Sequence, residues 1–134
     1  MSDQELFHEL SFYTLSHASA NFIHQHAVDV FTAQKANQET KLIAIYYALV
    51  GLYLYIEKGY TGKEVQNMHL KLSQGSKIFE PFDLPVEKGK ITVADVVRIE
   101  PGLKRDAMIK SWCEDVWSAY KHERPRVAAL LGSV

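Results

Sequence analysis

Histidine is the residue type in this sequence with the clearest capacity for chemistry. His17 ends the first apolar stripe along the chain and His69 lies in the fourth, both where a helix is expected to be apolar. His24 and His26 share the second stripe. A buried imidazole needs a hydrogen-bond partner for each ring nitrogen, and imidazoles brought together can bind a metal ion or transfer a proton. These histidines are therefore the first candidates for a functional site.

One hypothesis is a metal site formed by His17, His24 and His69 from three different helices. Three imidazoles with an open fourth position suit zinc or another borderline divalent cation, which can activate a bound water. Helical bundles build such sites from side chains on facing helices. His24 and His26 diverge by about 160° on one helix, so we do not expect both to bind the same ion.

The alternative is that each histidine is structural. A histidine on a helix face commonly bonds to a backbone carbonyl or to a tyrosine hydroxyl, and the chain has seven tyrosines. No other motif points to a reaction, because the sequence lacks HExxH, GxSxG, GxGxxG and phosphate-loop patterns. The one cysteine, Cys113, falls on an apolar helix face, where a thiol is expected to be inert.

Apolar periodicity predicts an all-α fold, a compact bundle of about five main helices in a single domain of residues 1–134. The main helices are expected near residues 6–17, 20–34, 40–58, 61–72 and 104–121, with a shorter helix between 92 and 101. The third helix is apolar nearly all round and should be central. Residues 75–91 are expected to form a long loop that acts as a lid or binding loop, with a short extended piece at 78–82.

The helix ends are expected at polar N-caps, glycine C-caps and prolines. The expected caps are Ser19 or Asn21 for the second helix, Gly59 at the end of the third, Thr61 with Glu64 for the fourth, and Thr92 with Asp95 for the short helix. Pro125 is expected to break the last long helix and to leave a short apolar tail at residues 127–131.

The second helix also carries a sequence motif between residues 24 and 34. It reads His-Gln, two residues, Val-Asp, one residue, an aromatic, two residues and Gln. This motif resembles that of a bacterial family of small helical domains of unknown function, and the Trp112-Cys113 pair is similar to that family as well. The resemblance brings no activity with it, and it favours His24 over His26 as the site histidine. The polar site that it implies consists of His24, Gln25, Asp29 and Gln34.

These four motif residues do not share one face of a straight helix. Gln25 and Asp29 are one turn apart, whereas Gln34 lies nearly opposite Gln25. A second interpretation is therefore that Gln25 and Asp29 bond to neighbouring loop backbone. The motif would then fix the second helix in place without any ligand.

The composition excludes some classes of partner. A formal net charge of −1 gives no electrostatic reason to expect nucleic acid or an anionic membrane as a partner. The longest uncharged run, residues 42–56, is shorter than the roughly 20 apolar residues that a membrane span needs. The acidic stretch at residues 1–9 lacks the pattern of a signal peptide, and we expect a cytoplasmic protein.

Two functions from different classes fit these observations. The first is a soluble protein that binds a divalent metal or a small molecule at a histidine-rich polar centre, with or without catalysis. The second is a non-catalytic interaction module or a homodimer, in which the histidines are structural. The first predicts a pocket lined by histidine, and the second predicts dispersed histidines with a large apolar surface.

Overall fold

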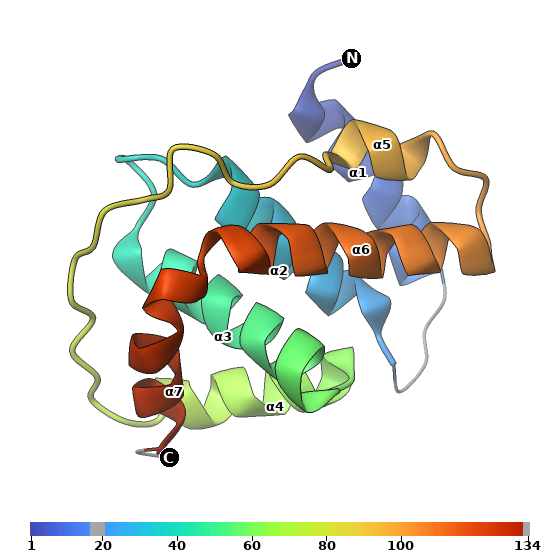
Figure 1. Cartoon of the computed structure of the whole chain (residues 1–134). Helices are drawn as coiled ribbons and strands as arrows, with labels where there is room; N and C mark the ends of the chain where they lie inside the picture. Colours follow the sequence, from blue (N-terminus) through green and yellow to red (C-terminus); the bar gives the residue numbers. More distant parts are fainter. Residues whose placement is uncertain (17–20, 133–134) are drawn as a thin grey trace.

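The centre of the molecule is an almost entirely apolar helix, as its composition predicts. The computed structural model describes residues 1–16 and 21–132, and in it α3 (Leu42–Lys58) buries every residue from Ala48 to Leu54. A helix buried around its whole circumference needs neighbours on all sides. α3 has them in α2 (Ile23–Lys35), α4 (Gly62–Ser73), α6 (Leu103–Ala119) and α7 (Arg124–Gly132) (Figure 1).

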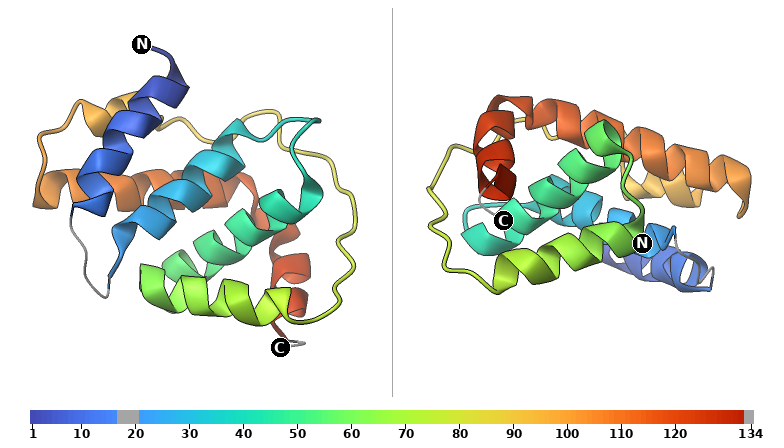
Figure 2. Two further views of the ribbon diagram at one scale, coloured as in Figure 1. Left: turned by 180° about the vertical axis from the view of Figure 1, so that it is seen from behind. Right: turned by 90° about the horizontal axis from the view of Figure 1, so that it is seen from below.

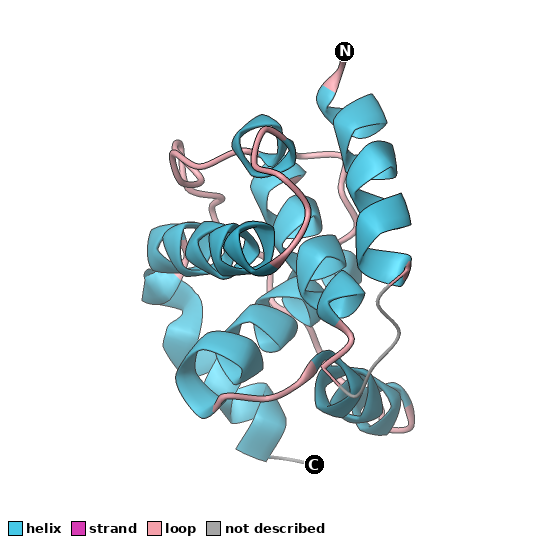
Figure 3. Cartoon of the chain, turned by 90° about the vertical axis from the view of Figure 1, so that its right-hand side faces the viewer, coloured by secondary structure: helices cyan, strands magenta, loops and turns pink. Residues whose placement is uncertain are grey.

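The predicted all-α fold is confirmed. The remaining helices are α1 (Asp3–Leu15) and α5 (Val93–Val97), and a short 3-10 turn at Lys121–Glu123 joins α6 to α7. α1, α2, α3, α4 and α6 are the expected main helices, and α5 is the expected short one. The extended piece expected at residues 78–82 is irregular loop, and the described part of the chain holds no strand (Figure 3). No helix among the described residues has the length and apolarity to cross a membrane.

α2 lies between the other layers of the bundle. It packs against α3 and α4 on one side and against α1 and α6 on the other, so it contacts four helices. The long loop between α4 and α5 runs around the outside of the molecule, past α3 and α7 (Figures 1 and 2). Any side chain that α2 buries therefore meets a different neighbour on each face, which makes this helix the natural place for a buried site.

Local capping sets several of the helix ends as expected. Thr61 accepts a hydrogen bond from the N–H of Glu64, whose carboxylate accepts from the N–H of Thr61, which completes the predicted capping box. Asp95 accepts from the N–H of Thr92 at the start of α5. Gly59 ends α3 with a φ of 70°, a backbone conformation that a residue without Cβ adopts at low cost.

The expected N-cap of α2 is wrong at Asn21, and Ser19 lies outside the described residues. The N-cap is Phe22, which has a φ of 38° and makes no side-chain capping bond. A tertiary contact explains this strained turn: the N–H of Gly62 donates to the Asn21 carbonyl at 2.6 Å. A Cβ on Gly62 would lie 1.9 Å from the Phe22 carbonyl oxygen. Packing against the start of α4 therefore fixes the start of α2, at a cost of about 1–3 kcal/mol for the unfavourable backbone.

The last long helix, α6, ends at Ala119, before Pro125, and the apolar residues expected as a short tail form a further helix. Pro125 occupies the first turn of α7, where the N–H that proline lacks has no helical partner to lose. Val127 in this helix is fully buried, and α7 packs against α3. The apolar residues after Pro125 thus complete the core.

The tryptophans of α6, and Tyr120 directly after it, are fully buried, and each polar tip has a partner from another helix. Tyr120 Oη donates to the Ala33 carbonyl at 2.7 Å. Trp117 Nε1 donates to Glu57 at 2.7 Å. The same Glu57 accepts from Arg124 Nε at 2.7 Å, so one carboxylate ties α3 to α6 and α7.

The close approach of α2 to α3 depends on Gly51. A Cβ placed on Gly51 would lie 1.8 Å from Oδ2 of Asp29 on α2, far inside van der Waals contact. Both residues are buried, and Gln25 Nε2 holds the Asp29 carboxyl group through its Oδ1.

We expect Gly51→Ala to destabilise the fold by about 1–3 kcal/mol, because the added methyl group overpacks the contact with Asp29. In an unstrained helix the same substitution would stabilise by about 0.5–1 kcal/mol. Guanidinium unfolding measures the difference. Gly132→Ala, whose new Cβ would meet nothing within 4 Å, is the control and should not lose stability. A Gly51→Ala protein as stable as the control would contradict this close packing.

Candidate functional site

Two of the three histidines predicted to bind a metal have hydrogen-bond partners within the fold. His24 Nδ1 lies 2.9 Å from Oγ1 of Thr14, a buried residue of α1. His69 Nε2 donates to the Tyr47 carbonyl at 2.9 Å, and the two rings stack. His24 is thus anchored to α1 and His69 to α3. The third, His17, lies outside the described residues.

The structure does not assemble a metal site in the part of the chain that it describes. Among residues 1–16 and 21–132, no three histidine, cysteine, aspartate or glutamate side chains are grouped so that they could hold a metal ion. The site of His17, His24 and His69 stays a prediction, since His17 is needed to complete it.

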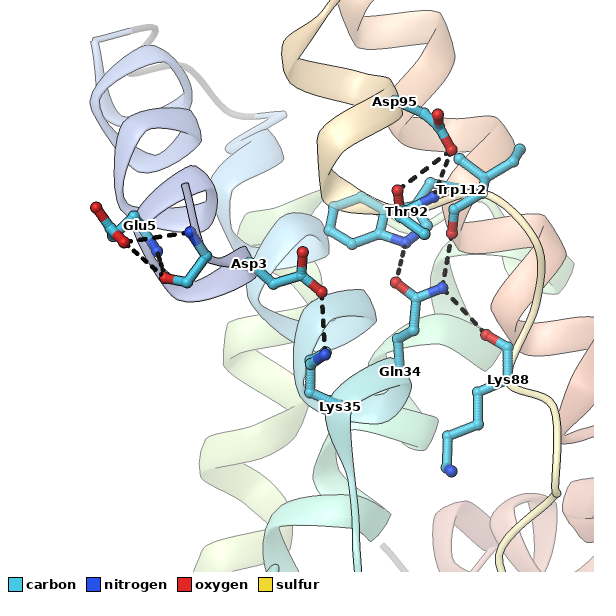
Figure 4. A network of polar contacts seen from close by, with 10 residues as sticks. Asp3, Glu5, Gln34, Lys35, Lys88, Thr92, Asp95 and Trp112 are labelled. Atoms are coloured by element: carbon cyan, nitrogen blue, oxygen red, sulfur yellow. Dashed lines mark hydrogen bonds and ion pairs between the residues drawn. The ribbon is translucent and has the colours of Figure 1, made fainter.

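Gln34 fastens the long loop to the bundle. Its Nε2 donates to the carbonyl oxygens of Lys88 at 3.2 Å and Ile91 at 2.6 Å, and its Oε1 accepts from Trp112 Nε1 at 2.9 Å (Figure 4). Asp115 on α6 adds a second attachment, because its Oδ2 accepts from the N–H of Ile91 at 2.7 Å. All the bonds of Gln34 are to protein groups, so its role is to hold the end of the loop against α2 and α6.

Gln25 and Asp29 bond to each other rather than to the loop backbone that the second interpretation of the motif expected. Gln25 Nε2 donates to Asp29 Oδ1 at 3.0 Å, and Gln25 Oε1 accepts from Gln66 Nε2 of α4 at 3.2 Å. This chain of amides ties α4 to α2 and ends on a buried carboxyl group. Polar side chains of helices, not a loop, are therefore the partners of these motif residues.

Asp29 is a carboxyl group with an unusual environment. It is only 4% exposed, and its Oδ2 has no hydrogen-bond partner among the described residues. Burial raises the pKa of Asp29 well above its usual value, against the opposing effect of the bond from Gln25. No cation among the described residues is paired with it, so the neutral, protonated acid is the form that this environment favours.

His26 is the more deeply buried of the two motif-region histidines, although the motif favoured His24. It is 3% exposed and stacks face to face on Tyr55 of α3, with ring centroids 3.5 Å apart and planes within 6°. Its Nδ1 is closed to water and has no hydrogen-bond partner in the part of the chain that the structure describes. Burial lowers the pKa of His26 to about 4, so the imidazole is neutral at pH 7. The signal for this burial was present in the sequence, since His26 falls on the broad apolar face of its helix.

Cys113 completes a buried polar centre, by which we mean His26, Asp29, Tyr55 and Cys113. The Cys113 thiol donates a long bond to the His26 carbonyl, with 3.8 Å between sulfur and oxygen. Burial raises the pKa of the thiol well above its usual value. A thiol with so high a pKa is a poor nucleophile, which agrees with the inert cysteine predicted from its helix face. The centre therefore contains neutral groups from α2, α3 and α6.

A pocket of about 670 Å³ lies against this centre. His26 and Tyr55 line it from α2 and α3, and Thr61 lines it from the start of α4. Its two charged lining residues, Asp106 and Lys110, come from α6. The volume falls within the range of about 300–1,000 Å³ that is usual for small-molecule sites.

The two charged residues of the pocket differ in their surroundings. Asp106 lies in the first turn of α6 and accepts a hydrogen bond from Tyr13 Oη at 2.5 Å. The Tyr13 hydroxyl also accepts from the N–H of Gly102 at 3.2 Å, so it is held in place. Lys110, one turn further along α6, is exposed and has no ion-pair partner in the part of the chain that the structure describes.

Asp29 gives a prediction for the pH dependence of stability. The folded state retains the Asp29 proton to higher pH than the unfolded chain, which loses it near pH 4. Wild-type stability should therefore fall, relative to Asp29→Asn, as the pH rises from about 4 towards the folded-state pKa. The expected slope is about 1.4 kcal/mol per pH unit, because one proton is lost on unfolding. Denaturant unfolding between pH 4 and 8 measures it.

Asp83→Asn, the same change at an exposed position, controls for the altered net charge. A constant difference in stability between Asp29→Asn and wild type across this pH range would show that Asp29 is ionised in the folded protein. In that case the polar centre would not be neutral.

A family model matches most of the chain. Residues 4–121 match a family described as a family of unknown function (DUF5946), which covers every helix from α1 to α6 in nearly its full length. No curated protein and no solved structure matches the chain. The expectation that the chain belongs to a family of unknown function is thus confirmed, whereas the match does not test the motif of the second helix. Because the match spans well over half of the sequence, the chain belongs to the DUF5946 family.

Proposed function

We propose that this protein binds a small organic molecule in the pocket beside His26, with the polar centre as the floor of the site. The observation that carries the proposal is a pocket of about 670 Å³ whose wall contains the neutral imidazole of His26, stacked on Tyr55. A concave space of this size with a fixed polar ring in its wall is typical of small-molecule sites.

The surroundings of His26 suit a binding role. A neutral imidazole offers one ring N–H as a donor and the other ring nitrogen as an acceptor. Stacking on Tyr55 fixes the ring plane, so these two groups keep a constant direction. The pocket also has apolar lining from Ile23 and Ala107. A few fixed polar groups in an apolar lining are typical of sites that bind small molecules.

For His24 and His69, a structural role accounts for the observed contacts better than metal binding does. The ring nitrogens of His24 and His69 that have protein partners tie helices together, which requires no metal. The proposal therefore rests on His26 and needs neither zinc nor another divalent ion. It does place the protein in the first of the two functional classes, and the buried, free Cys113 fits the proposed cytoplasmic location.

The alternative function, a non-catalytic interaction module, would use the outer face of α1 as its binding surface. Phe12 is 76% exposed and Leu15 is 51% exposed on this helix. Exposed apolar residues are common on soluble proteins, and only a large contiguous patch indicates an interface. A pocket of small-molecule size with the His26 imidazole in its wall is the more specific of the two observations.

We expect molecules that bind in this pocket to change the NMR resonance of the His26 ring. Small organic fragments would be screened against protein with ¹³C-labelled histidine rings, and binders should shift the His26 resonance. His26→Phe keeps a ring that can stack on Tyr55 but removes both nitrogens. We expect it to weaken these binders at least tenfold, because their hydrogen bond to the imidazole is lost.

His8→Phe, the same change at an exposed position of α1, is the control and should bind as the wild type does. Circular dichroism melting establishes that both variants are folded. The proposal fails if no fragment shifts the His26 resonance of the wild-type protein, or if binders retain full affinity for folded His26→Phe.

A further inference from the structure

We infer that the ligand of this pocket is a small organic carboxylate whose charged group pairs with Lys110. This inference rests on the proposed function and names the chemical class that the site would select. Its basis is the difference between the two charged residues of the pocket lining, Asp106 and Lys110.

Asp106 already has stabilising partners within the protein. Its Oδ1 accepts the short bond from Tyr13 Oη, and its position in the first turn of α6 places it near the positive end of the helix dipole. A ligand therefore gains little by pairing with Asp106. Lys110 has no such partner among the described residues, so it is the charge that a ligand can neutralise.

The other residues that line the pocket favour a ligand with a single negative charge. His26 is held neutral by burial and adds no second cation, and the hydroxyl of Tyr55 stays protonated because burial raises its pKa. A phosphate group carries a charge of about −1.5 to −2 at pH 7 and would face Asp106 with only one ammonium group to offset it. A carboxylate matches one ammonium group and can accept further bonds from neutral N–H or O–H donors.

The body of the ligand must fit a mainly apolar space. Ile23, Tyr60 and Ala107 line the pocket beside the polar groups. A molecule with a carboxylate at one end and a compact apolar or aromatic body would place its charge at Lys110 and its body against these residues. A polar group on that body would meet the neutral imidazole of His26 in the pocket wall.

The test compares acids with amides of the same shape. Benzoate, 4-hydroxybenzoate and cinnamate, each with its primary amide, would be titrated into the protein at low ionic strength, where charge pairing is least screened. The shift of the ¹³C-labelled His26 ring reports binding in the pocket. We expect at least one acid to bind at least tenfold more tightly than its amide. Lys110→Gln should abolish this preference and leave the affinity for the amide unchanged.

Lys104→Gln, an exposed lysine on the same helix that does not line the pocket, is the matched control and should keep the preference for acids. Amides that bind as tightly as acids, or a preference that survives Lys110→Gln, would overturn the inference and leave the proposed function intact. The inference is also overturned, and the proposed function left intact, if other fragments shift the His26 resonance but none of the three acids does. If no compound of any kind shifts it, the proposed function fails as well.

Discussion

The contact of Asp29 with Gly51 determines how closely α2 lies against α3, and the polar centre depends on that distance. A carboxyl group pressed against a helix backbone without a cation is costly unless it keeps its proton. The bonds from Gln66 to Gln25 and from Gln25 to Asp29 orient the group from the α4 side. With α2 held in this way, His26 is brought onto the ring of Tyr55 and its imidazole is removed from water.

The same arrangement explains why the pocket lies where it does. α2 supplies His26, α3 supplies Tyr55 and α6 supplies Asp106 and Lys110, so the site forms where three helices meet. Ligand sites in all-α proteins commonly lie between the helices of a bundle. The long loop, which the sequence pointed to as a lid, is fixed by Gln34 at its end near α5. The loop therefore stabilises the frame around the site.

Local signals predicted most of the helices but not all of their ends. The Thr61 capping box and Gly59 depend on neighbouring residues only, and both were predicted correctly. The start of α2 at Phe22 depends on a contact with Gly62 forty residues away, which no local pattern contains. For the site, the motif identified Asp29 and Gln34 as polar residues with partners, but it could not supply the partners. The importance of His26 follows from Tyr55 and the pocket, which only the fold brings to it.

The central claim is that His26 is a neutral, buried imidazole at the wall of a binding pocket. The most direct test follows the ¹⁵N resonances of the histidine rings by NMR between pH 4 and 8, with His26→Phe used to assign the His26 signals. The account predicts that His26 stays neutral throughout the range above pH 5 and begins to protonate only near its pKa of about 4. A midpoint near 6.5, the value of a histidine in water, would contradict the buried polar centre and the site built on it.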